Sequence, residues 1–199
     1  MNVKETILEE SLYLFSRHGI RALSKAQLEA HLGISHAAFD EIFQNKADLV
    51  QKTVAYLTKK LRYEYGKTYV QSQSAIEATL LMLKNASSRL ENFNPFFFRD
   101  LQKYYPSAWQ LYLDYIHTHV YQAIFKILNR GVIRGEFRKD INLELVTKIM
   151  LEMYIQMLNP LVFPPSRYNL AEVFRCFFLY YMEGLCVANT YRMVDEFFA

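Results

Sequence analysis

The most constraining feature of the sequence is a stretch of helix start and stop signals between residues 24 and 49. Ser24 is a good N-cap and Gln27 follows three positions later, a capping-box pattern that predicts a helix start. Gly33 can take the left-handed conformation that ends a helix, and Ser35 can cap the next helix two residues later. A connection this short requires two short helices that cross at a sharp angle. The chain is therefore expected to begin with a small helical module.

Similar signals flank this stretch on both sides. Upstream, apolar residues at helical spacing predict a first helix that Gly19 ends; they are Ile7, Leu8, Leu12, Leu14 and Phe15. Downstream, Asn45 is a good N-cap for a long helix, and Asp48 is favourably placed in its first turn. The helix after Ser35 has two faces. Its inward set is Ala38, Phe39, Ile42 and Phe43, and its outward set is His36, Ala37, Asp40 and Glu41.

The rest of the chain favours an all-α fold. Only six glycines and five prolines occur among 199 residues, and long periodic segments run without interruption. We expect further helices over 45–69, 74–90, 96–105, 107–134, 142–158 and 169–194, with a loop over 159–167. With the first three, these segments make nine helices. An apolar content of 52% is ample for a buried helical core.

The order of residues in the first fifty positions resembles the N-terminal domain of the tetracycline-repressor (TetR) family of transcriptional regulators. The matching positions are Ile7, Leu14-Phe15, Gly19, Leu23-Ser24, Leu28, Gly33-Ile34-Ser35, Phe39, Phe43, Lys46 and Leu49. A second stretch, 131–140, resembles the junction between the seventh and eighth helices of that family. The resemblance implies a nine-helix TetR-like fold. It also implies a helix-turn-helix DNA-binding domain over 1–48 and a ligand-binding and dimerisation domain over 49–199.

The resemblance further implies that the helix-turn-helix module contacts duplex DNA. Lys25 and His36 would contact the backbone, and Ala37 or Ala38 would touch a thymine methyl group. Asp40 or Glu41 would accept a hydrogen bond from a cytosine amino group. The full set of expected DNA-binding residues is Ser24, Lys25, Ser35, His36, Ala37, Ala38, Asp40 and Lys46.

Two features of this module argue against DNA binding. Residues 1–50 hold five basic and seven acidic side chains, a net charge of minus two, whereas duplex binders are normally basic. Asp40 stands where the family usually has a tyrosine. Asp40 and Glu41 therefore either read bases or form a solvated surface that meets no base. The second interpretation leads to an alternative function, a TetR-fold ligand-binding or interaction protein that has lost DNA binding.

The middle of the chain is rich in aromatic residues and methionine. Such residues at helical spacing usually pack as core, but the family uses this region, between its helices four and eight, as a ligand cavity. A lining with few charges suits a flat or apolar small molecule. The candidate ligand-binding residues are Met82, Phe97, Phe98, Tyr105, Trp109, Tyr112, Tyr115, His119, Met150 and Tyr154.

The last two long helices predict a homodimer. They carry more apolar surface than one core needs, and two helices from each of two subunits would form a four-helix interface. Two recognition helices are also needed to reach successive major grooves. The alternative is that the last helix is buried entirely within its own subunit. The candidate interface residues are Met153, Met157, Phe174, Phe177, Phe178, Tyr181 and Leu185.

No pattern in the sequence predicts catalysis, a metal site or a cofactor. The sequence has no Cys-x-x-Cys pair, no Glu-x-x-His pair and no glycine-rich phosphate loop. Cys176 and Cys186 lie about 15 Å apart along one expected helix, too far for a disulfide. No signal peptide opens the chain and no apolar run is long enough to span a bilayer. We therefore expect a cytoplasmic, ligand-responsive repressor that binds duplex DNA, an apolar effector and a second copy of itself, without enzymatic activity or a membrane partner.

Overall fold

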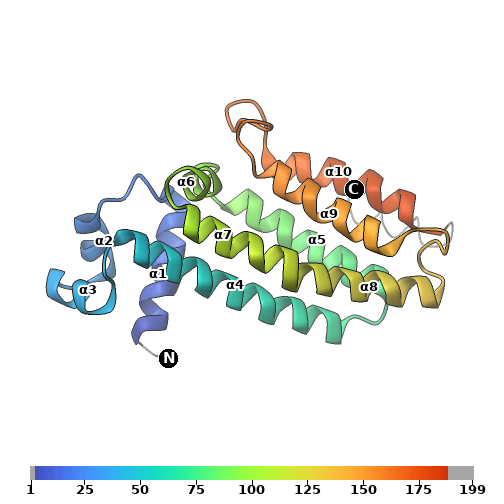
Figure 1. Cartoon of the computed structure of the whole chain (residues 1–199), viewed down its shortest axis with the longest axis horizontal. Helices are drawn as coiled ribbons and strands as arrows, with labels where there is room; N and C mark the ends of the chain where they lie inside the picture. The colour runs from blue at the N-terminus through green and yellow to red at the C-terminus, as the bar shows by residue number, and fades with distance from the viewer. Residues whose placement is uncertain (1–2, 188–199) are drawn as a thin grey trace. The chain divides into compact units, whose positions relative to one another are not determined.

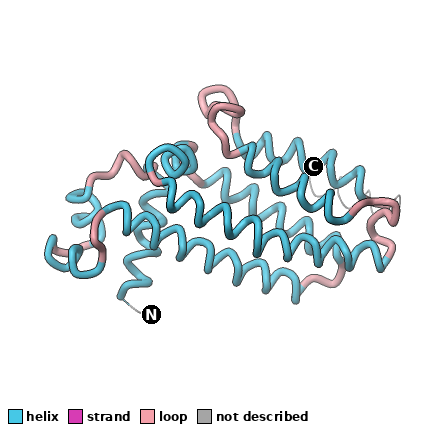
Figure 2. The backbone as a smooth tube through the Cα atoms, viewed as in Figure 1, coloured by secondary structure: helices cyan, strands magenta, loops and turns pink. Residues whose placement is uncertain are grey.

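A computed structural model describes residues 3–187, which are helical apart from the connections between helices, the longest of them between Met157 and Leu170 (Figures 1 and 2). The chain divides into two compact units. The first combines Met1–Leu61 with Asn92–Tyr115, and the second combines Arg62–Glu91 with Ile116–Ala199. These two units describe how the chain packs. The boundary expected between residues 48 and 49 separates functions instead, and it stays a prediction.

The first unit is built from five complete helices and the first part of a longer one. They are α1 (Val3–His18), α2 (Lys25–Leu32), α3 (His36–Ile42), the first part of α4 (Lys46–Gln71), α6 (Phe96–Tyr104) and α7 (Pro106–Tyr115). Contacts join α1 to α2, α2 to α3, α1 to α6 and α6 to α7. Large apolar side chains from these helices form its core, among them Phe15, Leu28, Phe39, Phe43, Leu49, Phe97 and Leu101. Each contributes about 1.5–3 kcal/mol when fully buried.

The second unit holds the rest of α4 and the helices of the last two-thirds of the chain. They are α5 (Ala75–Asn92), a π-helical turn η1 (Ile116–Val120), α8 (Tyr121–Arg134), α9 (Leu143–Met157) and α10 (Leu170–Leu185). Contacts join α8 to η1 and α9, and α9 to α10. Its core includes Ile76, Leu128, Phe137, Met150, Leu151, Phe174 and Met182.

The helix boundaries predicted between residues 24 and 38 are confirmed. The main-chain N–H of Gln27 donates to the Ser24 hydroxyl (3.3 Å), and the Ser24 N–H donates to the Gln27 side chain (2.8 Å). Gly33 ends α2 with a φ of 63°, a left-handed conformation that glycine adopts without strain. The Ser35 hydroxyl accepts from the Ala38 N–H at 3.2 Å and caps α3. Local capping chemistry therefore sets the α2–α3 connection.

The helix expected over 107–134 is continuous but not uniform. The structure places the π-helical turn Ile116–Val120 between α7 and α8. With α7, η1 and α8 taken as one run, the described residues form nine helices, as predicted. A π-helical turn widens the hydrogen-bond pattern by one residue, and this change leaves little trace in the spacing of apolar residues.

The last helix ends earlier than its expected end at Val194. α10 stops at Leu185, and residues 188–199 lie outside the described residues. The N–H of Val187 donates to the Glu136 carbonyl (3.3 Å), and the N–H of Arg138 donates to the Leu185 carbonyl (2.9 Å). This pairing with the segment after α8 replaces the next helical turn. It is a tertiary contact, so the helical period of the sequence does not reveal it.

None of the described helices is both long and apolar enough to cross a membrane. The two cysteines are free thiols, Cys176 exposed and Cys186 buried.

Candidate functional sites

The outward face of α2 and α3 carries four ionisable side chains that contact one another: Lys25, Glu29, His36 and Asp40. The Lys25 ammonium donates to Asp40 Oδ1 and lies 3.8 Å from Glu29 Oε1. His36 Nδ1 lies 2.9 Å from Glu29 Oε1, and His36 Nε2 lies 3.3 Å from Asp40 Oδ2. The four groups form a closed ring of contacts between the two helices, which we call the α2–α3 ion network.

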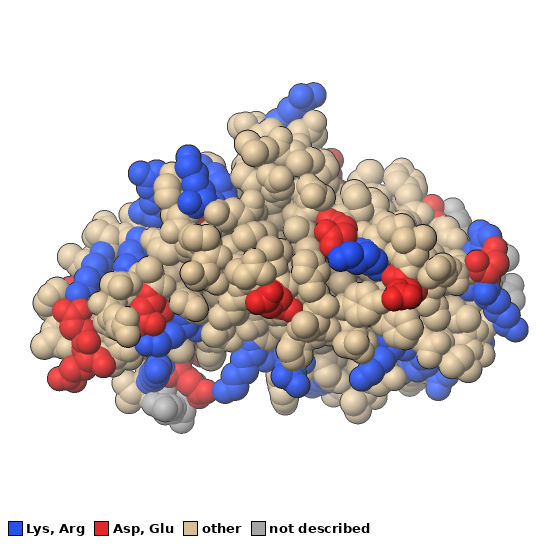
Figure 3. All heavy atoms as spheres, viewed as in Figure 1, with Lys and Arg blue, Asp and Glu red and all other residues tan. Residues whose placement is uncertain are grey.

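The α2–α3 ion network faces solvent and is charged. The side chains of His36 and Asp40 are 71% and 45% exposed, whereas that of Glu29 is 14% exposed. The hydrogen bond from Lys25 holds the pKa of Asp40 below its ordinary value, so this carboxylate is ionised at neutral pH. The Lys25 ammonium also lies 4.8 Å from the centre of the Phe39 ring, a cation–π arrangement. Figure 3 shows basic and acidic side chains intermixed at this end of the first unit.

The other expected DNA contacts near this network differ in exposure. Ser24 and Ser35 use their hydroxyl groups as helix caps, and both side chains remain at the surface. Ala37 is exposed and Ala38 is half-buried. Of the eight expected residues, the structure therefore brings Lys25, His36 and Asp40 into contact, with Ser24, Ser35, Ala37 and Ala38 in or next to the same two helices, and contact of any of them with DNA stays a prediction.

The eighth expected residue, Lys46, lies at the start of α4 and is half-buried. Its ammonium donates to the carbonyls of Ile20 (2.7 Å) and Leu23, and burial lowers the pKa of the amine. Lys46 therefore already holds the turn between α1 and α2. A phosphate contact from Lys46, which stays a prediction, would compete with these bonds.

Helix α6 holds the same turn from another side. The Asp100 side chain is 2% exposed and accepts from the Arg21 N–H at 2.8 Å and from Arg99 Nη2 at 3.0 Å. The Asn94 side chain, just before α6, donates to the Arg17 carbonyl at 3.1 Å. Sequence reasoning missed Asp100, because a lone acidic residue in a short helix gives no sign of burial.

Part of the expected ligand lining forms an aromatic cluster in the first unit. Phe97 and Phe98 of α6 contact each other edge to face, with ring centres 5.1 Å apart. Phe98 contacts Tyr112 of α7 at 5.6 Å, and Trp109 stacks on Tyr112 at 5.8 Å. Phe93 completes the cluster at 5.0 Å from Phe97. Phe97, Phe98 and Tyr112 are buried and Trp109 is half-buried, so these rings pack as core with one edge open.

The remaining expected ligand residues have varied surroundings. His119 is exposed and contacts the Thr118 hydroxyl at 2.9 Å, and Tyr154 contacts the Phe174 ring edge to face at 6.2 Å. Tyr105 is half-buried and lines a small polar hollow of about 270 Å³ beside the start of α4. The others are buried: Met82, Tyr115 and Met150. Their role in ligand binding stays a prediction.

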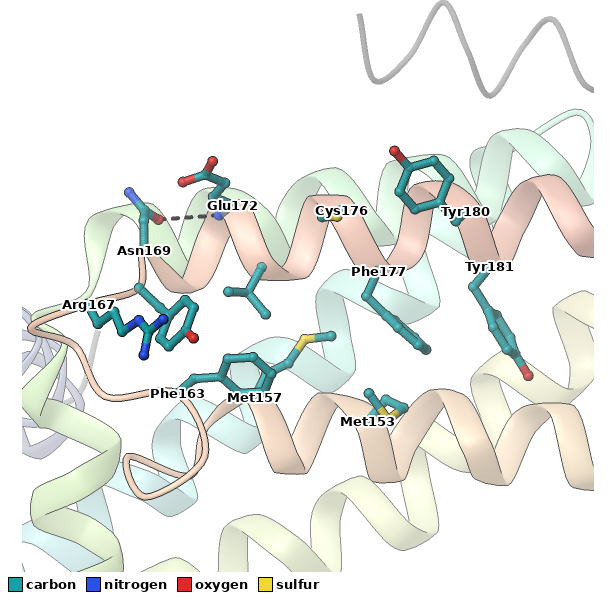
Figure 4. Close-up of a pocket in the computed structure, with 12 residues that line it drawn as sticks. Met153, Met157, Phe163, Arg167, Asn169, Glu172, Cys176, Phe177, Tyr180 and Tyr181 are labelled. Carbon is teal, nitrogen blue, oxygen red and sulfur yellow. Dashed lines mark hydrogen bonds between the residues drawn. The ribbon is translucent and has the colours of Figure 1, made fainter.

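A larger groove of about 830 Å³ lies between α9, α10 and the loop that joins them (Figure 4). Four of the expected dimer residues line it: Met153, Met157, Phe177 and Tyr181. The other three, Phe174, Phe178 and Leu185, are buried within the second unit. The expected interface residues therefore form two groups: four that line the groove and three that are buried in the core of the second unit.

Sequence reasoning missed the loop residues of this groove. Phe163 and Tyr168 contact each other edge to face at 5.6 Å, and Arg167 lies beside them at one end (Figure 4). Asn169 caps α10 by accepting from the Ala171 N–H at 2.9 Å. The sequence signal that could have indicated these groove residues is the presence of two aromatic side chains within or beside a proline-containing loop, because fully solvated loops are rarely aromatic.

The geometry defines a class of protein: a helical chain with an N-terminal helix-turn-helix module and a second helical unit that ends in an exposed apolar groove. No family model and no curated protein matches the sequence. Among solved structures, the chain is similar to a TetR-family transcriptional regulator from Agrobacterium tumefaciens, with 15% identity, a TM-score of 0.72, and coverage of 93% of this chain and 97% of that one. The fold is therefore that of the TetR family, as the sequence resemblance predicted.

Two further solved structures share this fold. One is PfmR from Thermus thermophilus, a TetR-family transcriptional regulator, with 24% identity, a TM-score of 0.59, and coverage of 90% of this chain and 96% of that one. The other is the transcriptional regulator FadR from Bacillus subtilis in complex with stearoyl-CoA, with 14% identity, a TM-score of 0.64, and coverage of 90% and 97%.

Proposed function

We propose that this chain is a cytoplasmic, homodimeric DNA-binding transcriptional regulator, most simply a repressor, whose DNA binding is altered by an apolar small molecule, and that it is not an enzyme. The observation that carries the proposal is the α2–α3 module, in which the half-buried Lys25 and the exposed His36 each lie at the first position of a capped helix. Helices joined by so short a turn are a common means of placing a helix in the major groove. The similar structures described as transcriptional regulators support the same function.

The aromatic cluster of the first unit is our candidate for the effector site. It is apolar, and Trp109 lies at its open edge. An acyl chain is the occupant that we propose to test, because FadR from Bacillus subtilis is described in complex with stearoyl-CoA. α6 also offers a route to the DNA-binding module, since it carries Phe97 and Phe98 as well as Asp100, which holds the α1–α2 turn.

The test is a salt titration of binding to the DNA upstream of the gene for this protein. We expect an affinity that falls steeply as salt rises, because each phosphate contact releases bound counterions. Stearoyl-CoA is expected to weaken binding and to change the fluorescence of Trp109, the one tryptophan in the chain. Absence of binding at low salt, or binding that ignores salt, would argue for the alternative function.

That alternative is a TetR-fold ligand-binding or interaction protein that no longer reads DNA. The specific observation in its favour is that the Lys25 ammonium, on the expected DNA-binding face, already donates a hydrogen bond to the ionised carboxylate of Asp40. Retention of ligand binding without any DNA binding would support it.

A further inference from the structure

The α2–α3 ion network places an anion on the groups that are expected to meet phosphate. Asp40 Oδ1 accepts from the Lys25 ammonium, and Asp40 Oδ2 lies 3.3 Å from His36 Nε2. Carboxylate and phosphate oxygens are both strong acceptors of hydrogen bonds from cationic groups. Asp40 therefore makes, within the free protein, the contacts that a DNA phosphate would make with the same two side chains.

We propose that Asp40 is an internal substitute for a DNA phosphate. It holds Lys25 and His36 across the two helices in the free protein, and it weakens DNA binding by competing with the backbone for them. This inference rests on the proposed function and adds a regulatory contact to it.

The exposure of the network allows such an exchange. The Lys25 side chain is 31% exposed and the Asp40 side chain 45% exposed, so a phosphate can approach both from solvent. Ion pairs this exposed are weak, because water and salt screen them. Glu29, which is mostly buried, contacts both Lys25 and His36 and stays in place as their anchor when Asp40 is displaced.

The experiment measures binding of the full chain to a labelled duplex of mixed sequence, about 30 base pairs long so that two half-sites fit. Fluorescence anisotropy is recorded over a range of salt concentrations for wild type and for Asp40→Asn, which keeps the shape of the side chain and removes its charge. The matched control is Glu41→Gln, because Glu41 is exposed on the same helix and no contact of Glu41 with Lys25 is seen. Circular dichroism checks that each variant is folded.

Asp40→Asn is expected to bind about tenfold more tightly than wild type at low salt and to steepen the log–log salt slope by about one, since one more cation is free for phosphate. Glu41→Gln is expected to change affinity less and to leave the slope unchanged. In a Lys25→Gln, His36→Gln background, Asp40→Asn should have no more effect than Glu41→Gln, because both side chains that Asp40 contacts are then absent.

The outcomes separate this inference from the proposed function. If Asp40→Asn and Glu41→Gln behave alike, or if Asp40→Asn binds more weakly than wild type, the inference is overturned and the proposed function stands. If wild type is silent and Asp40→Asn binds, the inference is supported and DNA binding by the native chain is overturned. If no variant binds at the lowest salt, both are overturned.

Discussion

Gly131 is a position where one added methyl group would disturb the packing of the second unit. A Cβ atom there would lie 2.2 Å from Phe137 Cδ2, and the Phe137 side chain is fully buried. Gly131→Ala is therefore expected to lower the free energy of unfolding by about 1–3 kcal/mol, the usual cost of overpacking a core. Urea unfolding followed by circular dichroism measures the change.

Gly66 in α4 is the matched control for this substitution. It is exposed, and an added Cβ would meet nothing within 4 Å. Gly66→Ala is expected to raise stability by about 0.5–1 kcal/mol, because alanine loses less backbone freedom in a helix than glycine. Equal effects of the two substitutions would contradict the packing argument.

Single residues differ in how far the sequence reveals their roles. Ser24, Gly33 and Ser35 were predictable, because capping is a local interaction between neighbours in the chain. The contact of Lys25 with Asp40 joins residues fifteen positions apart on different helices, so no local sequence pattern predicts it. Asp40 was expected either to read a base or to form a solvated surface, and its contacts with Lys25 and His36 were not predicted.

At the scale of helices, the turn between α1 and α2 depends on the start of α4. Lys46→Met would remove the donor to the carbonyls of Ile20 and Leu23, leaving both in a partly buried setting. We expect a loss of about 1–3 kcal/mol in the free energy of unfolding. Thermal or urea unfolding of the two proteins tests this.

Lys59→Met, also in α4, controls for the loss of one positive charge. Lys59 pairs with Glu5 at 3.0 Å, but its side chain is 76% exposed. Exposed pairs contribute little, so this variant should stay within about 0.5 kcal/mol of wild type. A Lys46→Met protein as stable as Lys59→Met would show that Lys46 does not support the turn.

The existence of the helices was predictable, with two local exceptions. The segments over 45–69, 74–90, 96–105 and 142–158 correspond to α4, α5, α6 and α9 with small shifts at their ends. The π-helical turn at Ile116–Val120 and the early end of α10 at Leu185 were not predicted. The end of α10 follows its pairing with the segment after α8, a tertiary contact that the apolar period within one segment does not encode, and the π-helical turn changes that period too little to be predicted.

At the scale of the whole molecule, the groove between α9 and α10 is expected to be covered by a second copy. Phe177, which is half-buried and lines the groove, would then be desolvated, and Phe177→Glu would bury an unpaired charge. We expect the dimer dissociation constant to rise by about tenfold or more. Sedimentation velocity at several protein concentrations measures it.

Ile133→Glu is the control for adding a charge to an apolar surface position. Ile133 lies on α8, is 74% exposed and does not line the groove. This variant should dimerise as wild type does. A wild-type protein that sediments as a monomer, or an equal effect of the two variants, would overturn the dimer.

The fold as a whole was predictable because two separated segments matched one family's pattern. The candidate sites were less so. The expected ligand lining mixes the rings of the aromatic cluster with residues such as His119 and Tyr154, which belong to the second unit. Periodicity identifies which side chains turn inward, but it does not tell which of them meet in space.

The contact of Asp40 with Lys25 has an evolutionary consequence. Aspartate and asparagine codons differ at one base, so a single point mutation is enough to remove the competing carboxylate. Under the proposed role of Asp40, selection for tighter DNA binding would need only that one heritable step, and the reverse change would restore the weaker binder. The affinity for DNA and the choice of target sequence would then be able to evolve independently of each other.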